Sequence, residues 1–435
     1  MPKPLRGVRR LLNEWQEVVL RRGWFRYDFF DGTNRPGLIL RYLARAWRQD
    51  WVAAYEQSLG RTFDTPPAIT FGAGRMALYA ILEALDIGPG DEVILPGYTC
   101  VVVPNAVLYR GATPVYVDLA PDSFNLDPEA VEAAITPRTK AVLAQHTFGQ
   151  PCDIEAIADL GRRHRLAVIE DCAHAVGASW NGRRVGTFGD VAFGSTDHTK
   201  MFSTVVGGFA CTSSAALAAR LRAIQRRAMP LPWFCQIQMM LQYVVLAVLY
   251  HPHVYWAARP AIELLERFRV LFAFRDELAT RRPARYPVTL SNVQAFLGAQ
   301  ELQVLEANLQ HRRALASRYR DILDPGLPIS PEGAWLRYSR LVASPQEWET
   351  RLGKYFVVGR WFSSIANGRT RDWSAIGYVP GRCPRAEYVA DHIVNFPTHP
   401  RIDEQAIQRF RRLVARSGLS VSPTIALHTA VEAPS

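Results

Sequence analysis

Lysine is scarce in this sequence: among 435 residues it occurs only at positions 3, 140, 200 and 354, beside 47 arginines. Arginine therefore carries the positive charge almost everywhere. A primary amine can form a Schiff base with an aldehyde, whereas a guanidinium cannot. A lysine in such a chain is thus a candidate nucleophile, although a solvated surface lysine is the simpler interpretation of any single one. The residues around Lys200 favour the first interpretation.

Cysteine is also scarce, and the six cysteines form no Cys-x-x-Cys pair and stand beside no His-x-x-x-His pair. This spacing argues against the common zinc sites and against a disulfide framework, so we expect no metal and a reducing compartment such as the cytoplasm. Residues 1–24 are basic and amphipathic but lack a continuous apolar core, which predicts no secretory signal.

Dense runs of one charge are absent, although the net charge is +11 and the isoelectric point is near 9.5. Such a charge permits attraction to nucleic acid, to an anionic membrane surface or to phosphorylated small molecules. Arginine is spread along the whole chain instead of forming a basic patch, so nucleic acid is the weakest of the three. The length and a hydrophobic content of 49% predict a globular protein of two lobes.

One stretch, residues 228–258, contains no Asp, Glu, Lys or Arg. Its most apolar part, 233–250, is about 18 residues long, which is near the lower limit for crossing a bilayer, but it contains three glutamines and is bracketed by prolines. We expect a buried or dimer-facing helical insert. The alternative is a hydrophobic hairpin that rests on the inner face of a membrane, flanked by Arg226, Arg227 and Arg259; a transmembrane span is least favoured.

Short apolar runs alternate with helical patterns between residues 70 and 215. The predicted strands are 92–95, 113–117, 141–145, 167–170, 191–194 and 208–212. The predicted helices include 75–85, 128–135, 154–164 and 215–227. This alternation predicts an α/β fold in which helices flank a mainly parallel central sheet.

The pattern changes towards the end of the chain. Residues 292–323 read as one or two amphipathic helices, and after Asp324-Pro325-Gly326 short mixed elements follow, ending in a helix at 403–415. We expect a smaller C-terminal α+β domain. The predicted organisation is an N-terminal helical segment at 1–50, a large α/β domain at 51–320 with the apolar insert at 228–280, the small domain at 321–420 and a flexible tail at 421–435.

Polar and aromatic residues follow the predicted strands, where ligands bind in parallel sheets. They are Gly97-Tyr98, His146, Asp171 with His174, and Ser195 with Lys200, joined by the turn Gly72-Ala73-Gly74-Arg75-Met76 before the first helix. An amine, a carboxylate, an aromatic face, a hydroxyl and a glycine turn together suit pyridoxal 5'-phosphate. In this hypothesis Lys200 and Asp171 are catalytic.

Each residue has a chemical role in that hypothesis and a simpler alternative. Lys200 would hold the cofactor aldehyde and later move a proton, and Asp171 would pair with the pyridine nitrogen, unless it only caps a helix. The turn at 72–76 and Ser195 would bind the phosphate, unless they are ordinary turn residues. Tyr98 would stack on the ring, unless it belongs to the core. His174 would contact the ring and His146 would line the site, unless both are structural.

With these residues in place, the sequence resembles the DegT/StrS family of pyridoxal-phosphate aminotransferases of fold type I, which act on nucleotide-linked keto sugars. The resemblance covers roughly residues 50 to 415. It is carried by FGAGRMAL (71–78), GPGDEVILPGYT (88–99), NAVLYRGATPVYVDL (105–119), ITPRTKAVLAQHTFGQPCDI (135–154), VIEDCAHAVGA (168–178), VGTFGD (185–190), STDHTK (195–200), QAFLGAQEL (294–302) and CPRAEYVADHIVNFPTHP (383–400).

The resemblance implies a fold type I transferase whose cofactor-bearing lysine is Lys200 and whose pyridine-nitrogen aspartate is Asp171. It further implies a ring contact at His174. Its phosphate contacts fall on Gly74, Arg75 and Ser195, within the turn that ends at Met76, and its stacking aromatic falls on Tyr98.

The family also implies a function: glutamate donates an amino group that passes to a sugar ketone in a ping-pong cycle, and two chains form a homodimer in which each completes the other's site. We therefore expect a cytoplasmic aminotransferase of polysaccharide or glycoconjugate synthesis that binds no nucleic acid. Three features depart from the family's pattern. They are Val205-Val206-Gly207-Gly208 after the lysine, Pro287-Val288-Thr289 in place of an Asn-Tyr-Arg motif, and the long insert.

Three alternatives remain at this point. One is a pyridoxal-phosphate lyase or a dehydratase acting on a sugar; dehydratase relatives carry histidine in place of the lysine, so Lys200 argues against that version. The second is a non-catalytic cofactor-binding regulatory protein. The third is a membrane-surface protein whose insert is its main functional part.

Overall fold

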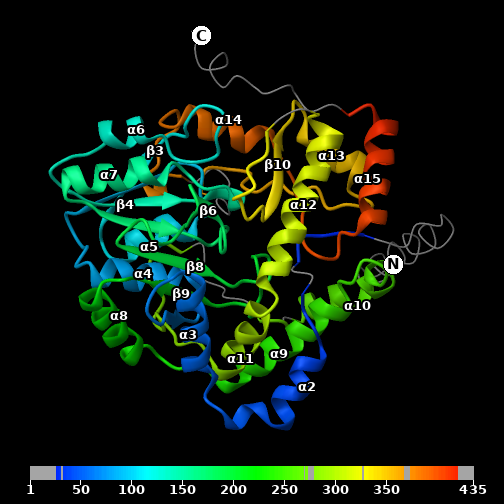
Figure 1. Ribbon diagram of the computed structural model, residues 1–435, viewed down its shortest axis with the longest axis horizontal. Helices are drawn as coiled ribbons and strands as arrows, with labels where there is room; N and C mark the ends of the chain where they lie inside the picture. Colours follow the sequence, from blue (N-terminus) through cyan, green and yellow to red (C-terminus); the bar gives the residue numbers. More distant parts are fainter. Residues whose placement is uncertain are drawn as a thin grey trace, which may run out of the picture.

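The computed structural model describes residues 26–30, 33–268, 270–272, 279–325, 328–366 and 373–419. Within these ranges a central sheet is surrounded by helices, and a second, smaller group of strands and helices lies beside it, at the right of Figure 1. The predicted tail at 421–435 and the first 25 residues of the predicted N-terminal segment lie outside the described residues.

The central sheet has seven strands in the order β1-β9-β8-β5-β4-β2-β3. The strands are β1 (Ile69–Phe71), β2 (Glu92–Pro96), β3 (Thr113–Val117), β4 (Thr139–Gln145), β5 (Ala167–Asp171), β8 (Val191–Ser195) and β9 (Gly208–Cys211). The strands from β3 to β8 pair in parallel, while β9 runs antiparallel to both of its neighbours. The predicted α/β class with a mainly parallel sheet is confirmed, and β1 is the one strand of this sheet that was not predicted.

Helices pack on this sheet because packing removes their apolar sides from water. They are α4 (Gly74–Ala84), α5 (Val102–Tyr109), α6 (Pro128–Ala133), α7 (Ile154–His164) and α8 (Ala215–Arg227), with α3 (Trp51–Thr62) and α11 (Asn292–Leu302) packed together below. Two of them, α7 and α8, have the predicted bounds. Asp153 accepts from the Ala156 N–H to begin α7, and Ser214 does the same for α8 through Leu217.

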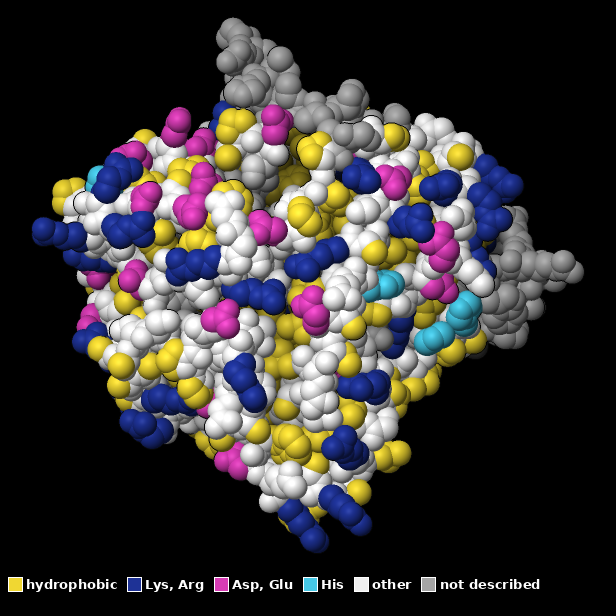
Figure 2. Space-filling model, viewed as in Figure 1, with side chains coloured by type: hydrophobic (Ala, Val, Ile, Leu, Met, Phe, Trp, Pro, Cys, Tyr) yellow, Lys and Arg dark blue, Asp and Glu magenta, His cyan; other side chains and the backbone are white. Residues whose placement is uncertain are grey.

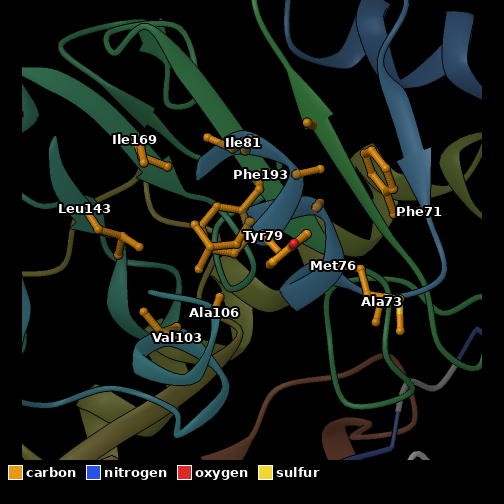
Figure 3. Packing of buried hydrophobic residues seen from close by; sticks show 14 of the residues in the cluster. Phe71, Ala73, Met76, Tyr79, Ile81, Val103, Ala106, Leu143, Ile169 and Phe193 are labelled. Carbon is orange, nitrogen blue, oxygen red and sulfur yellow. The ribbon is translucent and has the colours of Figure 1, made fainter. Parts of the chain in front are cut away.

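Helix α4 is buried along most of its length, which fixes its first turn against the sheet. Figure 3 shows Met76, Tyr79 and Ile81 of α4 beside Phe193 of β8. Burying such a side chain contributes roughly 1.5–3 kcal/mol. The N-terminus of α4 is therefore held rigidly over the ends of β8 and β9.

The smaller group is built from two antiparallel strands, β10 (Arg337–Leu341) and β11 (Ile393–Pro397). They pack with α12 (Leu305–Leu323), α13 (Pro345–Leu352) and α15 (Glu404–Ser417), largely around an aromatic core, while the buried side of α14 (Pro384–His392) joins the core of the large sheet. The short elements η2 (Thr147–Gly149), β6 (Ser179–Trp180), β7 (Arg183–Arg184) and η3 (Ser374–Ile376) complete the set. The predicted domain boundary at residue 320 falls inside α12 and stays a prediction.

Part of the N-terminal segment and the first helix of the insert lie at the lower end of the molecule, and the second helix of the insert extends from there to the right (Figure 1). The segment contains α2 (Gly37–Ala44) and η1 (Ala46–Arg48), and the insert contains α9 (Trp233–Val248) and α10 (Tyr255–Arg267). One face of α9 joins the core through Met239 and Tyr243. Among the described helices, none combines the length and the apolar character that crossing a membrane requires.

Candidate functional site

A cavity of about 260 Å³ lies where β5 and β8 end and α4 begins, with a wall from the smaller group of elements. The predicted residues that line it are Gly74, Arg75, Asp171, His174, Ser195 and Lys200. A wider groove of about 800 Å³, lined by parts of α7 and α8, includes none of the predicted residues. Because ligands bind beyond the carboxyl ends of parallel strands, the smaller cavity is the candidate site.

Asp171 is the last residue of β5, and its side chain is buried. Its Oδ1 accepts a hydrogen bond of 2.9 Å from the Ala173 N–H. Burial raises the pKa of Asp171, while that N–H and the positive charge of Lys200 oppose the rise. A buried carboxylate of this kind is stabilised by a cationic ligand group.

Lys200 lies on the turn that follows β8, where its N–H donates to the Asp197 carbonyl at 2.9 Å. Burial lowers the pKa of its amine, and the carboxylates of Asp197 and Asp171 oppose this effect. Its Nζ stands 4.4 Å from the centre of the Trp361 ring. The amine is thus held in a partly desolvated site, where its neutral, nucleophilic form becomes more accessible.

The first turn of α4 faces Ser195. Ala73, the N-cap residue, makes no side-chain capping bond, so its side chain satisfies none of the backbone N–H groups of this turn. A Cβ added to Gly74 would lie 2.9 Å from the Ser195 Cβ, which shows how closely the two residues approach. An uncapped helix N-terminus beside a hydroxyl is a favourable phosphate site.

His174 lies within an aromatic group on the cavity wall. Its Nδ1 accepts from the Phe148 N–H at 3.3 Å, which leaves Nε2 as the protonated, donating nitrogen. Its ring centre is 4.9 Å from that of Trp361. Burial, reinforced by Lys200, lowers the pKa of His174 well below its ordinary value, so the ring is neutral at physiological pH.

Behind Trp361 stands Arg337, whose guanidinium carbon is 3.7 Å from the centre of the Trp361 ring and 4.0 Å from that of Phe29. The side chain is buried, its Nε has no hydrogen-bond partner among the described residues, and burial lowers the pKa of Arg337 to about 9. Cation–π contacts with the Trp361 and Phe29 rings stabilise this buried positive charge. Arg337 therefore fixes the position of Trp361.

Several lining residues were not predicted: Cys100, Gln145, Asp197, Thr199, Trp361 and Phe362. Asp197 could have been predicted from the sequence, since it follows β8 by two residues. Although burial raises the pKa of Asp197, His198 and Lys200 hold it below the usual value, and Thr199 donates to its Oδ1 through both N–H and hydroxyl. Asp197 thus supplies a second negative charge near Lys200.

Tyr98 and Met76 do not line this cavity, contrary to prediction. Tyr98 is fully buried in the core, packs edge-on against Phe148 and Phe362, and its hydroxyl accepts from the Phe362 N–H at 2.6 Å. Cys100, two residues later, lines the cavity instead. Met76 lines a neighbouring cavity of about 510 Å³.

His146 belongs to a buried network next to the site. Its Nδ1 accepts from the Cys152 N–H, and its Nε2 meets the Glu170 carboxylate at 3.2 Å. His146, Glu170 and Cys172 could place three ligand atoms together. Glu170, however, already accepts three backbone N–H groups, so the network is satisfied by the protein and reads as structural.

The groups in the cavity fit a pyridoxal 5'-phosphate. The α4 turn with Ser195 suits its phosphate, the buried Asp171 suits a protonated ring nitrogen, and the amine of Lys200 suits an aldehyde. The side-chain chemistry therefore agrees with the cofactor that the sequence suggests.

Comparison with known proteins supports the same reading. Residues 46–238 match the DegT/DnrJ/EryC1/StrS aminotransferase family. GDP-perosamine synthase of Caulobacter vibrioides is 41% identical over 202 residues, which are 46% of this chain and 54% of that protein, so the chain spans about half of that relative. UDP-N-acetyl-3-dehydro-alpha-D-glucosamine 3-aminotransferase of Acidithiobacillus ferrooxidans is 30% identical over 352 residues, 79% of this chain and 82% of that protein.

Solved structures agree in fold. The aminotransferase TlmJ of Streptoalloteichus hindustanus is 26% identical, with a TM-score of 0.68 over 89% of this chain and 97% of TlmJ. DesV of S. venezuelae is 26% identical, with a TM-score of 0.69 over 95% of this chain and 98% of DesV. Because the 30% identical relative also aligns along most of both chains, this protein belongs to the DegT/DnrJ/EryC1/StrS family of pyridoxal-phosphate-dependent aminotransferases.

Proposed function

We propose that the protein transfers an amino group, with L-glutamate as the donor, to a ketone of a nucleotide-linked sugar in polysaccharide or glycoconjugate synthesis. The observation that carries the proposal is the meeting of Lys200, Asp171 and the uncapped N-terminus of α4 in one cavity. Two relatives whose names specify nucleotide-linked or amino sugars support the substrate class.

Within this proposal each side chain has a defined task. When bound, pyridoxal 5'-phosphate supplies an aldehyde and a ring that withdraws electrons from a substrate carbon. Lys200 holds the aldehyde carbon, and Asp171 keeps the proton on the ring nitrogen. Gly74, Arg75 and Ser195 would bind the phosphate, and His174 would offer its Nε2 proton to the ring.

Lys200 also serves as the base. Its Nζ would take the proton from the Cα of the amino donor. Burial supports this role, because it lowers the pKa of the amine and so increases the neutral fraction near neutral pH. Asp197 and Asp171 limit the lowering, which keeps Lys200 able to hold the proton that it takes.

We assign the aromatic contact to Trp361 instead of Tyr98. Trp361 lines the cavity near both Lys200 and His174, whereas Tyr98 lies in the core. Arg337 holds the far side of its ring. In this arrangement the smaller group of elements supplies one wall of the cofactor site.

The overall exchange needs no external oxidant or reductant. The donor amine becomes a ketone, the sugar ketone becomes an amine, and two such half-reactions share one site. We further propose a cytoplasmic homodimer in which the partner chain completes each site, with a large domain at 51–320 and a small domain at 321–420.

The test is to load the purified protein with pyridoxal 5'-phosphate, add glutamate and follow the visible absorption of the bound cofactor. The proposal predicts that glutamate bleaches the band and that a UDP- or GDP-linked keto sugar restores it, with an amino sugar found by mass spectrometry. Lys200→Ala should abolish both changes, while Lys140→Ala, an exposed lysine, leaves them intact. A band that glutamate leaves unchanged would remove the donor assignment.

A further inference from the structure

The exposed apolar side chains of this protein are concentrated in one part of the chain. Among the described residues, twelve of the thirteen large exposed hydrophobic side chains lie at 40–47 and 229–268, and Val379 is the exception. Scattered exposed apolar residues are ordinary, whereas a gathered set marks an interaction surface. The two segments belong to α2 with η1 and to the insert helices.

The segment that leads into α2 is hydrogen-bonded to α9. The backbone N–H of Arg35 donates to the Tyr243 hydroxyl at 3.0 Å, and the buried sides of both helices join the same core. Their other sides remain exposed, with Leu40 at 71% and Trp233 at 73%. We call this surface the apolar face. It consists of Leu40, Leu43 and Trp47 together with Trp233, Ile237 and Leu241.

The spacing shows that each helix contributes a stripe. On α9 the residues are four apart, at 233, 237 and 241, and on α2 and η1 they fall at 40, 43 and 47. On α9 this spacing puts the three residues on one side of the helix, and on α2 it does the same for Leu40 and Leu43, while Trp47 lies on η1 after the break at Arg45. Because α9 buries its opposite side in the core, the exposed stripe is not needed to pack the helix onto the protein.

The two segments that carry the apolar face, residues 33–49 and 228–258, contain no carboxylate. Residues 33–49 contain Arg35, Arg41, Arg45 and Arg48 and no carboxylate, and residues 228–258 contain no charged side chain. Within the described part of the chain none of these arginines forms an ion pair, and Arg48 lies over the Trp47 ring at 5.3 Å. In Figure 2 arginine or lysine side chains stand beside apolar ones at the lower tip, where Figure 1 places α2.

We propose that the apolar face binds the surface of an anionic lipid bilayer. The apolar stripes enter the boundary between headgroups and acyl chains, tryptophan lies at the headgroup level, and arginine pairs with lipid phosphate. A second copy of the chain fits less well, because a two-fold interface would bring the same arginines from both copies together without carboxylates. The proposal is independent of the reaction that the enzyme catalyses.

Co-sedimentation of the cofactor-loaded protein with vesicles tests the proposal. Vesicles of equal parts phosphatidylcholine and phosphatidylglycerol should bind the protein, and vesicles of phosphatidylcholine alone should bind it much less. The double variant R45Q/R48Q should lower the partition coefficient about 25-fold, since each arginine near an anionic surface contributes about fivefold, or about 1 kcal/mol. Added salt should weaken the binding of the wild type more than that of this variant.

Apolar contacts are tested by Ile237→Glu, which should reduce binding about tenfold or more because a carboxylate then meets the lipid boundary. Val379→Glu changes an apolar residue elsewhere that is even more exposed than Ile237, and this variant should bind as the wild type does. Retained visible absorption by the bound cofactor shows that each variant is folded.

Two results would overturn the proposal. The first is binding that Ile237→Glu and Val379→Glu affect equally. The second is a wild type that ignores the mixed vesicles while Ile237→Glu turns a dimer into a monomer in sedimentation velocity, since that assigns the apolar face to a second copy.

Discussion

At Gly208 the backbone at the start of α4 leaves no room for a side chain next to the candidate phosphate site. It lies on β9, opposite Ser195 on β8. A Cβ at Gly208 would fall 2.3 Å from both the Ala73 carbonyl carbon and the Gly74 nitrogen. These atoms are backbone at the start of α4, so they cannot rotate away.

The cost of Gly208→Ala follows from that geometry. Ordinary van der Waals contact begins near 3.4 Å, so the first turn of α4 must move by about 1 Å. Overpacking of this kind costs about 1–3 kcal/mol. If that shift falls on the N–H groups that hold the phosphate, the dissociation constant for pyridoxal 5'-phosphate rises roughly 5- to 150-fold.

The assay is a titration of the cofactor-free protein with pyridoxal 5'-phosphate, followed by absorption, together with thermal unfolding with and without the cofactor. Binding to the folded state raises the midpoint, so weaker binding shrinks the shift. Gly88→Ala is the matched control, because its nearest neighbour would be the Arg110 carbonyl oxygen at 3.8 Å. Equal cofactor affinity in the two variants would refute the proposed phosphate site.

Three further predictions concern the site and the stability of the fold. Asp171→Asn should slow the bleaching by glutamate about tenfold or more, because it removes a charge-assisted hydrogen bond of about 1.5–3 kcal/mol, and an unchanged single-turnover rate would argue against the pairing with the ring nitrogen. Trp361→Ala should raise the dissociation constant of the cofactor several-fold, while Trp233→Ala should not. Equal dissociation constants for the two variants would show that Trp361 only packs against its neighbours. Burial lowers the pKa of His399 to about 3, and its ring accepts from the Arg401 N–H and donates to the Asp28 carbonyl. Below about pH 6.5 His399 binds a proton in the unfolded chain but stays neutral in the folded chain. The free energy of unfolding should therefore fall by roughly 2 kcal/mol between pH 7 and pH 5, and by less in His399→Gln. Denaturant curves with equal pH dependence in both proteins would contradict this.

The fold was largely predictable because its strands are short apolar runs between clear helical patterns. Strand β1 was missed since three residues, Ile69–Phe71, give too little pattern to recognise. The apolar insert was recognised, but its periodicity could not tell which partner its exposed side would have. That side became visible only when the structure showed Met239 and Tyr243 buried and Ile237 exposed.

The part of the candidate site that lies at the carboxyl ends of the strands could be predicted from the sequence. Lys200, Asp171 and Ser195 line one cavity because parallel strands bring their carboxyl ends to one edge of the sheet, and their roles there stay a prediction. Tyr98 was wrongly expected in the cavity, since the position of a strand end does not show which residue of a turn faces the ligand, and Cys100 has that place. Trp361 comes from the smaller group of elements, more than 150 residues from Lys200 in sequence, and only tertiary packing brings it near.

The central claim is that Lys200 carries the cofactor, and the scarcity of lysine makes it directly measurable. The loaded protein is reduced with borohydride, which makes the bond between lysine and cofactor permanent, and its peptides are analysed by mass spectrometry. Because Lys200 carries the cofactor, the added mass is expected on the peptide that contains Lys200 and on no peptide that contains Lys140 or Lys354. Added mass on either of those lysines, or no labelled peptide at all, would contradict it.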